Sequence, residues 1–431
     1  MTVKAIVCGL AGLAFLAACG ERDVILPGER LDLRPTDATP NETRAINLVS
    51  PVANADWTHR NGEPDHSIRH PLLGAALTQV FSVDIGEGDS RRARITADPV
   101  VDDGVVYTLD ARAQVTATNT NGALLWTANV TPANDGANDA SGGGLAIADG
   151  RVFVTTGFGE LTVLNAKTGA EIWTQDLDAA VGSPPTVLGD LVYVVSRDSR
   201  ASAIEVDTGR IRWQINGTPS VGNFSGGAGP AVNNEIAVFP MPSGEVLGAF
   251  PQGGLRRWSS VVTGQRLGES SSDISDIAGD PVISGNTVYA ANFAGRLVAM
   301  KATNGDRIWT ATEGAVSPVW PAGGSVFLVN EISQLVRLDG RDGSIIWKVD
   351  LPKFTETRFR QQRTVFAHYG PVLAGGKLLV ASSDGIIRQF DPSSGALVGS
   401  VAIEGGAASN PVVAGQTLYV VSKEGRLVAF R

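Results

Sequence analysis

The sequence predicts an all-β protein: an eight-bladed β-propeller whose blades are four-stranded antiparallel sheets, closed by an N-terminal strand that completes the last blade. Three observations lead to this prediction. A Trp recurs with a Gly four residues before it, short strands and turns repeat in a fixed order, and the final repeat lacks its fourth strand. The recurring Trp residues lie 47, 40, 45, 51 and 38 residues apart, at Trp126, Trp173, Trp213, Trp258, Trp309 and Trp347. Repeats of about 40–50 residues indicate a solenoid, a propeller or an array.

One repeat, between Asp280 and Trp309, shows the pattern most clearly. Its expected strands are residues 281–283, 287–291, 297–300 and a fourth that begins at Arg307, with turns rich in Gly and Asn between them. Short β-branched strands separated by such turns are typical of meandering hairpins. Because Pro cannot donate to a strand ladder, Pro281 is placed at the start of the first strand. The same order opens eight repeats, near Pro99, Leu145, Pro184, Pro230, Pro281, Pro318, Pro371 and Pro411.

The last two repeats explain how the ring is expected to close. The seventh has Gly395 but carries Gly399 where a Trp is expected, and the eighth stops at Arg431 after three strands. Residues 77–83 suit the missing strand, with Phe81 in the position of the Trp. Such closure removes open sheet edges, which β proteins otherwise have to protect. The sequence therefore predicts a propeller over residues 77–431.

The N-terminus has the features of an export signal. Lys4 precedes an apolar run over residues 5–15, which is too short for a membrane-spanning helix. Small residues then lead directly into Cys19, the pattern of a bacterial lipobox. We expect residues 1–18 to be a lipoprotein signal peptide and Cys19 to carry the lipid. Gly20, where an Asp would favour the inner membrane, indicates the outer membrane. The alternative is a secreted protein without lipid.

Residues 19–76 are expected to form a lipid-anchored tether. The segment is rich in Pro and polar residues and shows no clear strand pattern until its end. If flexible, it spans about 40 Å, and less if Trp57 docks on the propeller. Cys8 is lost with the signal, so Cys19 is the only remaining Cys and no internal disulfide forms. The fold must therefore be held by packing.

The composition and motifs do not indicate an enzyme. A net charge of -9 and a pI near 5.1 argue against binding nucleic acid. His59, His66, His70 and His368 lack an H-E-x-x-H pattern, so a metal site at the first three is the weaker interpretation and a structural role the stronger. No G-x-S-x-G motif or nucleotide-binding fingerprint occurs in a suitable context. We expect no catalytic residues, no metal and no cofactor.

The repeat itself resembles a known type. Residues 161–173, Leu-Thr-Val-Leu-Asn-Ala-Lys-Thr-Gly-Ala-Glu-Ile-Trp, are similar to the repeat of pyrroloquinoline-quinone-type propellers. That repeat occurs in quinoprotein dehydrogenases and in non-enzymatic relatives. With the lipobox, the eight repeats and the length, the chain resembles the BamB family, the lipoprotein subunit of the β-barrel assembly machinery. The resemblance implies a non-enzymatic scaffold on the periplasmic face of the outer membrane. It would bind the periplasmic domains of BamA, the barrel-inserting subunit, and aid folding and insertion of outer-membrane proteins, whose unfolded chains are a further class of partner.

In that family two loops on one face carry the contact with BamA, and they correspond here to residues 219–229 (loop one) and 268–280 (loop two). In loop two, Ile274, Ser275 and Asp276 match a family Leu-Ser-Asp motif, Asp273 precedes it, and Ala278 replaces a second Asp. In loop one, Ser225 falls near a family Arg and Phe224 stands in place of an aliphatic residue. The resemblance implies that these residues bind the partner: Asp273, Ile274, Ser275, Asp276, Phe224 and Ser225. The alternative for the two Asp is a pair of solvated loop acids.

Two other functions stay open at this stage. One is a lipid-anchored propeller that binds another envelope protein or a glycan. The other is a quinoprotein dehydrogenase, but such enzymes are usually longer and carry a paired-Cys disulfide, whereas Cys19 is the only Cys of the mature chain.

Overall fold

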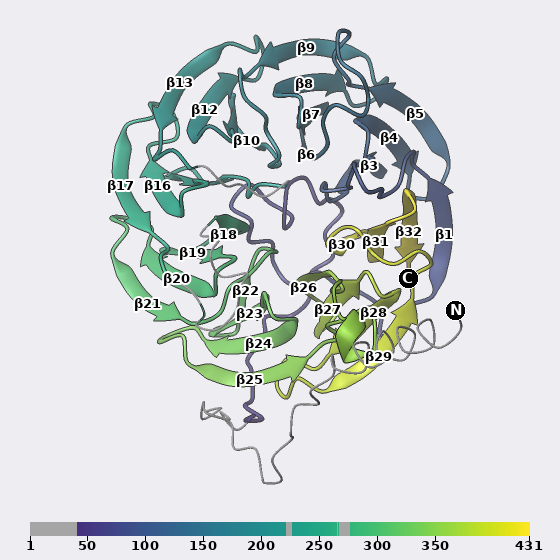
Figure 1. The fold of residues 1–431 in the computed structure, drawn as a ribbon, viewed down its shortest axis with the longest axis vertical. Coiled ribbons are helices and arrows are strands. Elements are labelled where there is room, and N and C mark those ends of the chain that lie inside the picture. Colours follow the sequence, from purple (N-terminus) through teal and green to yellow (C-terminus); the bar gives the residue numbers. More distant parts are fainter. Residues whose placement is uncertain (1–40, 221–225, 265, 267–275) are drawn as a thin grey trace, which may run out of the picture. The chain divides into compact units, whose positions relative to one another are not determined.

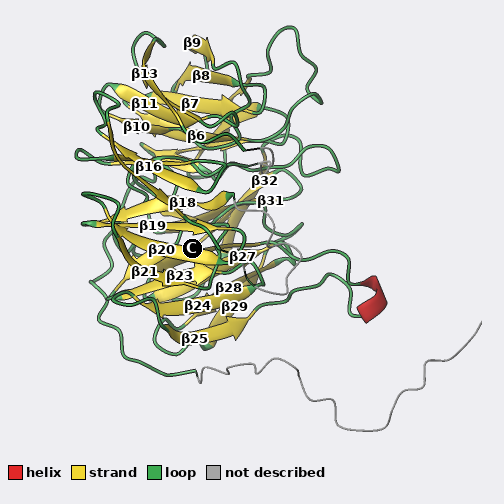
Figure 2. Ribbon diagram, turned by 60° about the vertical axis from the view of Figure 1, so that its left-hand side comes forward, coloured by secondary structure: helices red, strands yellow, loops and turns green. Residues whose placement is uncertain are grey.

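Eight four-stranded antiparallel sheets make up the protein and stand around a common axis as the blades of a propeller (Figure 1). The computed structural model describes residues 41–220, 226–264, 266 and 276–431. The fold class predicted from the sequence is confirmed. Within these residues the one helical element is a single 3-10 turn, η2 (Phe359–Gln361), which projects from the propeller (Figure 2). No helix in the described part of the chain is long and apolar enough to cross a membrane.

Blades one to four follow each other along the chain, each running from the innermost strand outward. Their strands are β2 (Val100–Asp102), β3 (Val105–Leu109), β4 (Gln114–Asn119) and β5 (Leu124–Asn129); β6 (Gly143–Ala148), β7 (Arg151–Thr156), β8 (Glu160–Asn165) and β9 (Glu171–Asp176); β10 (Thr186–Leu188), β11 (Leu191–Val195), β12 (Arg200–Glu205) and β13 (Ile211–Asn216); β14 (Ala231–Val232), β15 (Ala237–Pro240), β16 (Glu245–Ala249) and β17 (Arg256–Val261).

Blades five to eight continue the ring in the same way. Their strands are β18 (Ile277–Ser284), β19 (Thr287–Asn292), β20 (Arg296–Lys301) and β21 (Arg307–Ala311); β22 (Trp320–Ala322), β23 (Ser325–Val329), β24 (Gln334–Asp339) and β25 (Ile345–Asp350); β26 (His368–Ala374), β27 (Lys377–Ser382), β28 (Ile386–Phe390) and β29 (Leu397–Ala402); and β30 (Val412–Ala414), β31 (Thr417–Ser422), β32 (Arg426–Phe430) and β1 (Gln79–Asp84).

The N-terminal strand closes the ring as predicted. Strand β1 pairs antiparallel with β32, and Phe81 lies opposite Ala429. Just before it, Thr78 and Arg431 exchange two backbone hydrogen bonds of 2.6 and 2.9 Å, so the two ends of the propeller are joined edge to edge. The Phe81 ring packs 6.4 Å from that of Tyr419. The last blade therefore combines the first and the last strands of the chain.

Each recurring Trp packs against a Gly of the next blade, which explains the spacing seen in the sequence. A Cβ atom built on Gly169 would lie 2.6 Å from the ring of Trp126, and Gly169 has a φ of 71°, which favours Gly. The indole Nε1 of Trp126 also donates to the carbonyl of Ala166 at 2.9 Å. Phe81 takes the same role against Gly122, at 2.8 Å. Blade seven has Gly399 in place of a Trp, beside the one blade whose fourth strand comes from the chain's other end.

Antiparallel order gives the propeller two distinct faces. The cap face carries the turns between the first and second strands of each blade, such as those at Gly150 and Gly285. The loop face carries the connections from one blade to the next, including loop one and loop two. The central channel runs between these faces, and the two partner-binding loops predicted from the sequence therefore belong to one face.

Residues 41–76, named the cap segment here, pack on the cap face rather than extending as a flexible tether. Its contacts reach the innermost strand or first turn of all eight blades: Asn54 on Gly415, Trp57 on Val101, Thr58 on Ile147, His59 on Val187, Pro64 on Val232, Asp65 on Ile283, Trp57 on Trp320 and Pro71 on Gly375. From Asn54 to Asp65 the order follows the blades around the axis, and Figure 1 shows the segment crossing the middle of the ring. For residues 41–76 the tether expectation is therefore corrected, and the docking of Trp57 is the reason.

Candidate partner-binding face

Several residues predicted to bind a partner lie outside the described part of the chain. These are Phe224 and Ser225 of loop one, Asp273, Ile274 and Ser275 of loop two, and the lipid-attachment residue Cys19. What the structure describes of both loops is their ends, and those ends meet. The backbone N–H of Gly229, the last residue of loop one, donates to Oδ1 of Asp280, the last residue of loop two, at 2.6 Å.

The contact between the two loop ends requires a Gly at position 229. A Cβ atom there would lie 2.7 Å from the carbonyl oxygen of Pro184 and 3.2 Å from Oδ1 of Asp280. Asp280 itself is only 2% exposed and sits in the long first strand of blade five. The two loops therefore leave the propeller side by side from a packed base.

Asp276 lies in that base and not on the surface. The residue is 6% exposed, and its carbonyl accepts a hydrogen bond of 3.2 Å from the N–H of Phe293. With Arg197 and Gly227 it borders a small cavity between the loop bases. The interpretation of Asp276 as a solvated loop acid is wrong because the side chain is buried. The expectation that Asp276 contacts the partner is corrected for the same reason, since this buried residue belongs to the support of loop two.

Arg60 of the cap segment reaches the same place from the other side of the channel. Its guanidinium lies 3.0 Å from Asp280 and 3.1 Å from Asp98, and its side chain is 13% exposed. Burial opposes the charge of Arg60, but the two carboxylates outweigh this and raise its pKa. Asp98 in turn accepts hydrogen bonds from the backbone and side-chain amides of Asn410. Blades one, five and eight and the cap segment thus share one charged node.

A hollow of about 280 Å³ opens above this node on the loop face. Arg60, Asp98 and Asn410 form part of its lining, and Phe293, Val316 and Tyr369 provide an apolar and aromatic wall. Gly226 and Gly227 of loop one and Ala278 of loop two also line it. Both loops therefore border the mouth of the central channel.

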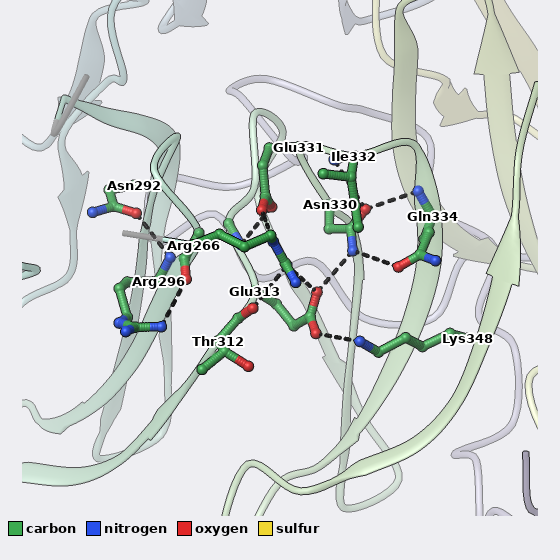
Figure 3. Close-up of polar contacts among 12 residues, drawn as sticks. Arg266, Asn292, Arg296, Thr312, Glu313, Asn330, Glu331, Ile332, Gln334 and Lys348 are labelled. Carbon is green, nitrogen blue, oxygen red and sulfur yellow. Dashed lines mark hydrogen bonds and ion pairs between the residues drawn. The ribbon is translucent and has the colours of Figure 1, made fainter. Parts of the chain in front are cut away.

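A second charged cluster holds the chain just before loop two (Figure 3). Arg266, two residues before the loop, pairs with Glu331 at 2.6 Å and with Glu313 at 2.9 Å. Glu313 is completely buried and also pairs with Lys348 at 2.6 Å and with Asn330 at 2.7 Å. Burial opposes the charge of Arg266, but the glutamates outweigh it and raise its pKa. Buried ion pairs thus hold the chain on both sides of loop two, at Arg266 two residues before it and at Asp280, its last residue.

No role is predicted from the sequence for the residues that hold the ends of the loops. One signal was available for Arg60, because the openings of blades one and five read Asp-Pro, at Asp98 and Asp280. These blades stand opposite each other in a ring of eight, so the two carboxylates face across the channel and require a cation between them. For Arg266 and its partners no such signal exists, since blades five and six supply the glutamates from separate connecting loops.

The histidines of the cap segment are structural. His59 accepts a hydrogen bond from the N–H of Val187, and burial lowers the pKa of His59 to about 3. His66 bonds the carbonyl of Pro281, and His70 accepts from the N–H of Gly376. Within the residues described, no group of three or more His, Cys, Asp or Glu is placed to hold a metal ion. The three side chains fasten the segment to blades three, five and seven.

Comparisons with known proteins agree with this architecture. The family model described as "Outer membrane protein assembly factor BamB" matches residues 111–349 and 354–431. Outer membrane protein assembly factor BamB of Shewanella oneidensis is 27% identical over 310 residues, 69% of this chain and 73% of the relative. The crystal structure of BamB from Moraxella catarrhalis superimposes with a TM-score of 0.69 at 19% identity, covering 83% of this chain and 100% of that one. A europium-containing methanol dehydrogenase shares the fold, with a TM-score of 0.66 at 14% identity over 87% of this chain and 98% of that one.

Proposed function

Since the chain belongs to the BamB family of outer membrane protein assembly factors, we propose that it is a non-enzymatic, lipid-anchored scaffold that binds the periplasmic domains of BamA through its loop face. The observation that carries this proposal is the junction of the two loops. Gly229 and Asp280 bond directly at 2.6 Å, so the described ends of loop one and loop two lie side by side at the channel mouth. Asp273, Ile274 and Ser275 of loop two and Phe224 and Ser225 of loop one are the proposed contact residues.

The rigidity of the loop bases supports a binding role. A binding surface gains affinity when its residues are ordered before the partner arrives, because less entropy is lost on association. Arg266, two residues before loop two, and Asp280, its last residue, are both paired with buried opposite charges. The described residues on either side of the loop are therefore ordered before a partner arrives.

The location of the protein follows from its proposed lipid. We place the lipid on Cys19, the propeller in the periplasm and the anchor in the outer membrane. Residues 20–40 connect Cys19 to the cap segment, whose first described residues, Asn41 and Glu42, bond to the outer strand β25 of blade six. The scaffold is therefore attached to its anchor at the rim of the propeller. Unfolded outer-membrane proteins are proposed as a second class of partner.

The direct test is co-purification of the lipidated protein with its stoichiometric partner from outer membranes. Asp273→Arg in loop two is expected to reduce recovery of BamA by at least about tenfold, the scale of one disrupted charge or contact at an interface. Asp207→Arg is the matched control, because Asp207 lies in a turn of blade three on the cap face with its side chain 80% exposed. It is expected to leave recovery unchanged.

The outcomes separate the proposal from its alternatives. Recovery of BamA with both variants at the level of the unaltered protein would contradict the assignment of loop two. Recovery of a different envelope protein in place of BamA would contradict the partner. Alcohol oxidation by the protein supplied with pyrroloquinoline quinone and calcium would show the activity of the dehydrogenases that share this fold, and would overturn the non-enzymatic role. A Cys19→Ser variant that stays with the outer membrane would contradict the lipid anchor.

A further inference from the structure

We infer that Arg60 is a positioning residue for partner binding: it locks the bases of both partner-facing loops to the cap segment, so the segment that leads to the membrane also sets the geometry of the opposite face. This inference rests on the proposed function of the loop face. Arg60 does not lie on either loop, and it reaches them through Asp280. It is carried by a set of short contacts among buried groups in the described part of the chain.

The first step is the position of Arg60 on the axis of the propeller. Its guanidinium lies between Asp98 of blade one and Asp280 of blade five, 3.1 and 3.0 Å away. These blades are diametrically opposed, so one cation joins opposite sides of the ring. The guanidinium suits this task because its charge is spread over several nitrogens, so that Nε lies 3.0 Å from Asp280 while Nη1 lies 3.1 Å from Asp98, whereas an ammonium is a single point charge. Removal of Arg60 would leave two carboxylates, 9% and nearly 0% exposed at their side chains, without their counter-charge.

The second step is the double use of Asp280. One of its oxygens, Oδ2, faces Arg60, while the other, Oδ1, accepts the hydrogen bond from Gly229 at the end of loop one. Asp280 also terminates loop two. A shift of this single carboxylate therefore moves the ends of both loops together. The ion pair with Arg60 holds the carboxylate in its position.

The third step is that the cap segment makes further bonds close to Arg60, to blades four and five, into which loop one and loop two lead. The carbonyl of Pro64 accepts from Val232 of blade four, and that of Asp65 accepts from Ile283 of blade five. His66 bonds the carbonyl of Pro281, the residue after Asp280, at 2.7 Å. Residues 60–66 of the cap segment thus bond to the first strands of blades four and five, the blades that begin directly after loop one and loop two. Through these contacts the cap segment supports the bases of the loops, in addition to covering the channel.

The test compares Arg60→Lys and Arg60→Met with the unaltered full-length protein in two measurements. Hydrogen–deuterium exchange reports the amides of residues 226–232 and 276–284, and titration with the purified periplasmic region of BamA reports affinity. Arg60→Lys keeps the charge but concentrates it on one nitrogen, which cannot pair with both carboxylates as Nε and Nη1 do. We expect exchange at these amides to rise and affinity to fall by about tenfold, the scale of coupling between connected sites. Arg60→Met is expected to raise exchange and to lower affinity further than Arg60→Lys does. Asp280→Asn, which keeps an acceptor for the N–H of Gly229, is expected to change both quantities less.

Arg337→Met is the matched control because it loosens the same cap segment elsewhere. Arg337 is buried in blade six and donates to the carbonyls of Arg44 and Ala45. The variant is expected to raise exchange at residues 41–48 and to leave residues 226–232, residues 276–284 and affinity unchanged. The inference is overturned if Arg60→Lys raises exchange at the loop bases without weakening binding, or leaves exchange unaltered. If the unaltered protein does not bind BamA, the proposed function fails, while the exchange data still decide whether Arg60 braces the loops.

Discussion

The packing of each Trp against a Gly of the next blade makes a quantitative prediction within a single blade. Gly150 and Gly169 both lie in turns of blade two, with φ values of 69° and 71°. They differ in their surroundings. A Cβ atom on Gly150 meets no atom within 4 Å, whereas on Gly169 it would lie 2.6 Å from the ring of Trp126. Substitution of each by Ala therefore separates backbone strain from the loss of the contact between blades.

The expected magnitudes follow from the two environments. An Ala at positive φ costs about 1–2 kcal/mol in either turn, and a smaller unfolded-state entropy offsets part of that cost. Gly169→Ala adds the displacement of the Trp126 ring, and overpacking of a well-packed site costs about 1–3 kcal/mol. An unfolding entropy of about 2.1 cal/mol/K per residue gives roughly 0.8 kcal/mol/K for the packed unit that ends at Arg431. The extra loss in melting temperature for Gly169→Ala is then about 1–4 °C.

Differential scanning calorimetry on both variants at matched pH and scan rate measures this difference. Fluorescence of Trp126, whose ring must move, is expected to change in Gly169→Ala and to stay constant in Gly150→Ala. Equal melting temperatures for the two variants, within the error of the instrument, would refute the reasoning, because the positive φ would then explain the whole effect and the contact between blades would contribute nothing.

Three further predictions concern buried groups. In His59→Gln the amide oxygen of Gln replaces the ring nitrogen as acceptor for the N–H of Val187. The folded pKa of His59, about 3, lies below its unfolded value of 6.5. The contribution of His59 to stability is therefore present above pH 6.5 and is lost as the pH falls toward 3. Urea unfolding should therefore show that the variant loses about 2 kcal/mol less than the unaltered protein between pH 7.5 and pH 5. Glu313→Gln leaves Arg266 and Lys348 without their shared counter-charge and should cost about 3–5 kcal/mol by the same method; a cost below 1 kcal/mol would contradict the pairing. Trp57→Ala, which empties the stack on Trp320, should cost about 3–5 kcal/mol and increase proteolysis between residues 50 and 70.

The propeller was predictable from the sequence because its signals are local and repeated. The spacing of Gly and Trp, the Pro near the start of most blades and the incomplete last repeat each reflect one turn or one strand. Pro281 lies inside β18, which begins at Ile277, and not at the strand start expected for it. Even the closing strand could be placed, since Phe81 stands where a Trp is expected and packs against Gly122. Blade seven lacks its Trp for a related reason. In the other blades this Trp packs on a Gly in the turn between the third and fourth strands of the next blade, whereas in blade eight no turn joins β32 to β1.

The cap segment was not predictable in the same way. Its residues form no strand pattern, and its bonds run from irregular backbone to eight separate blades, so no period in the sequence reports them. A Pro-rich polar stretch is typical of a flexible linker, whereas the burial of residues such as Trp57, Leu73 and the three His shows that this one is packed. These residues were visible in the sequence, but their partners lie more than a hundred positions away, as with His59 and Val187.

The cap segment and the closing strand both contribute to closing the ring of blades. The ring is sealed by one antiparallel pair, β1 on β32, and the end-to-end contact of a long chain carries a loop-closure cost. The cap segment ends at residue 76, three positions before β1 begins at Gln79, and it is bonded to blades on every side of the channel. Once it is docked, β1 is held close to β32 and has only a short connection to order. The closing strand therefore acquires a high effective concentration at its partner edge. This arrangement secures a ring with no internal disulfide, and it does so with the same residues that fix the geometry of the loop face.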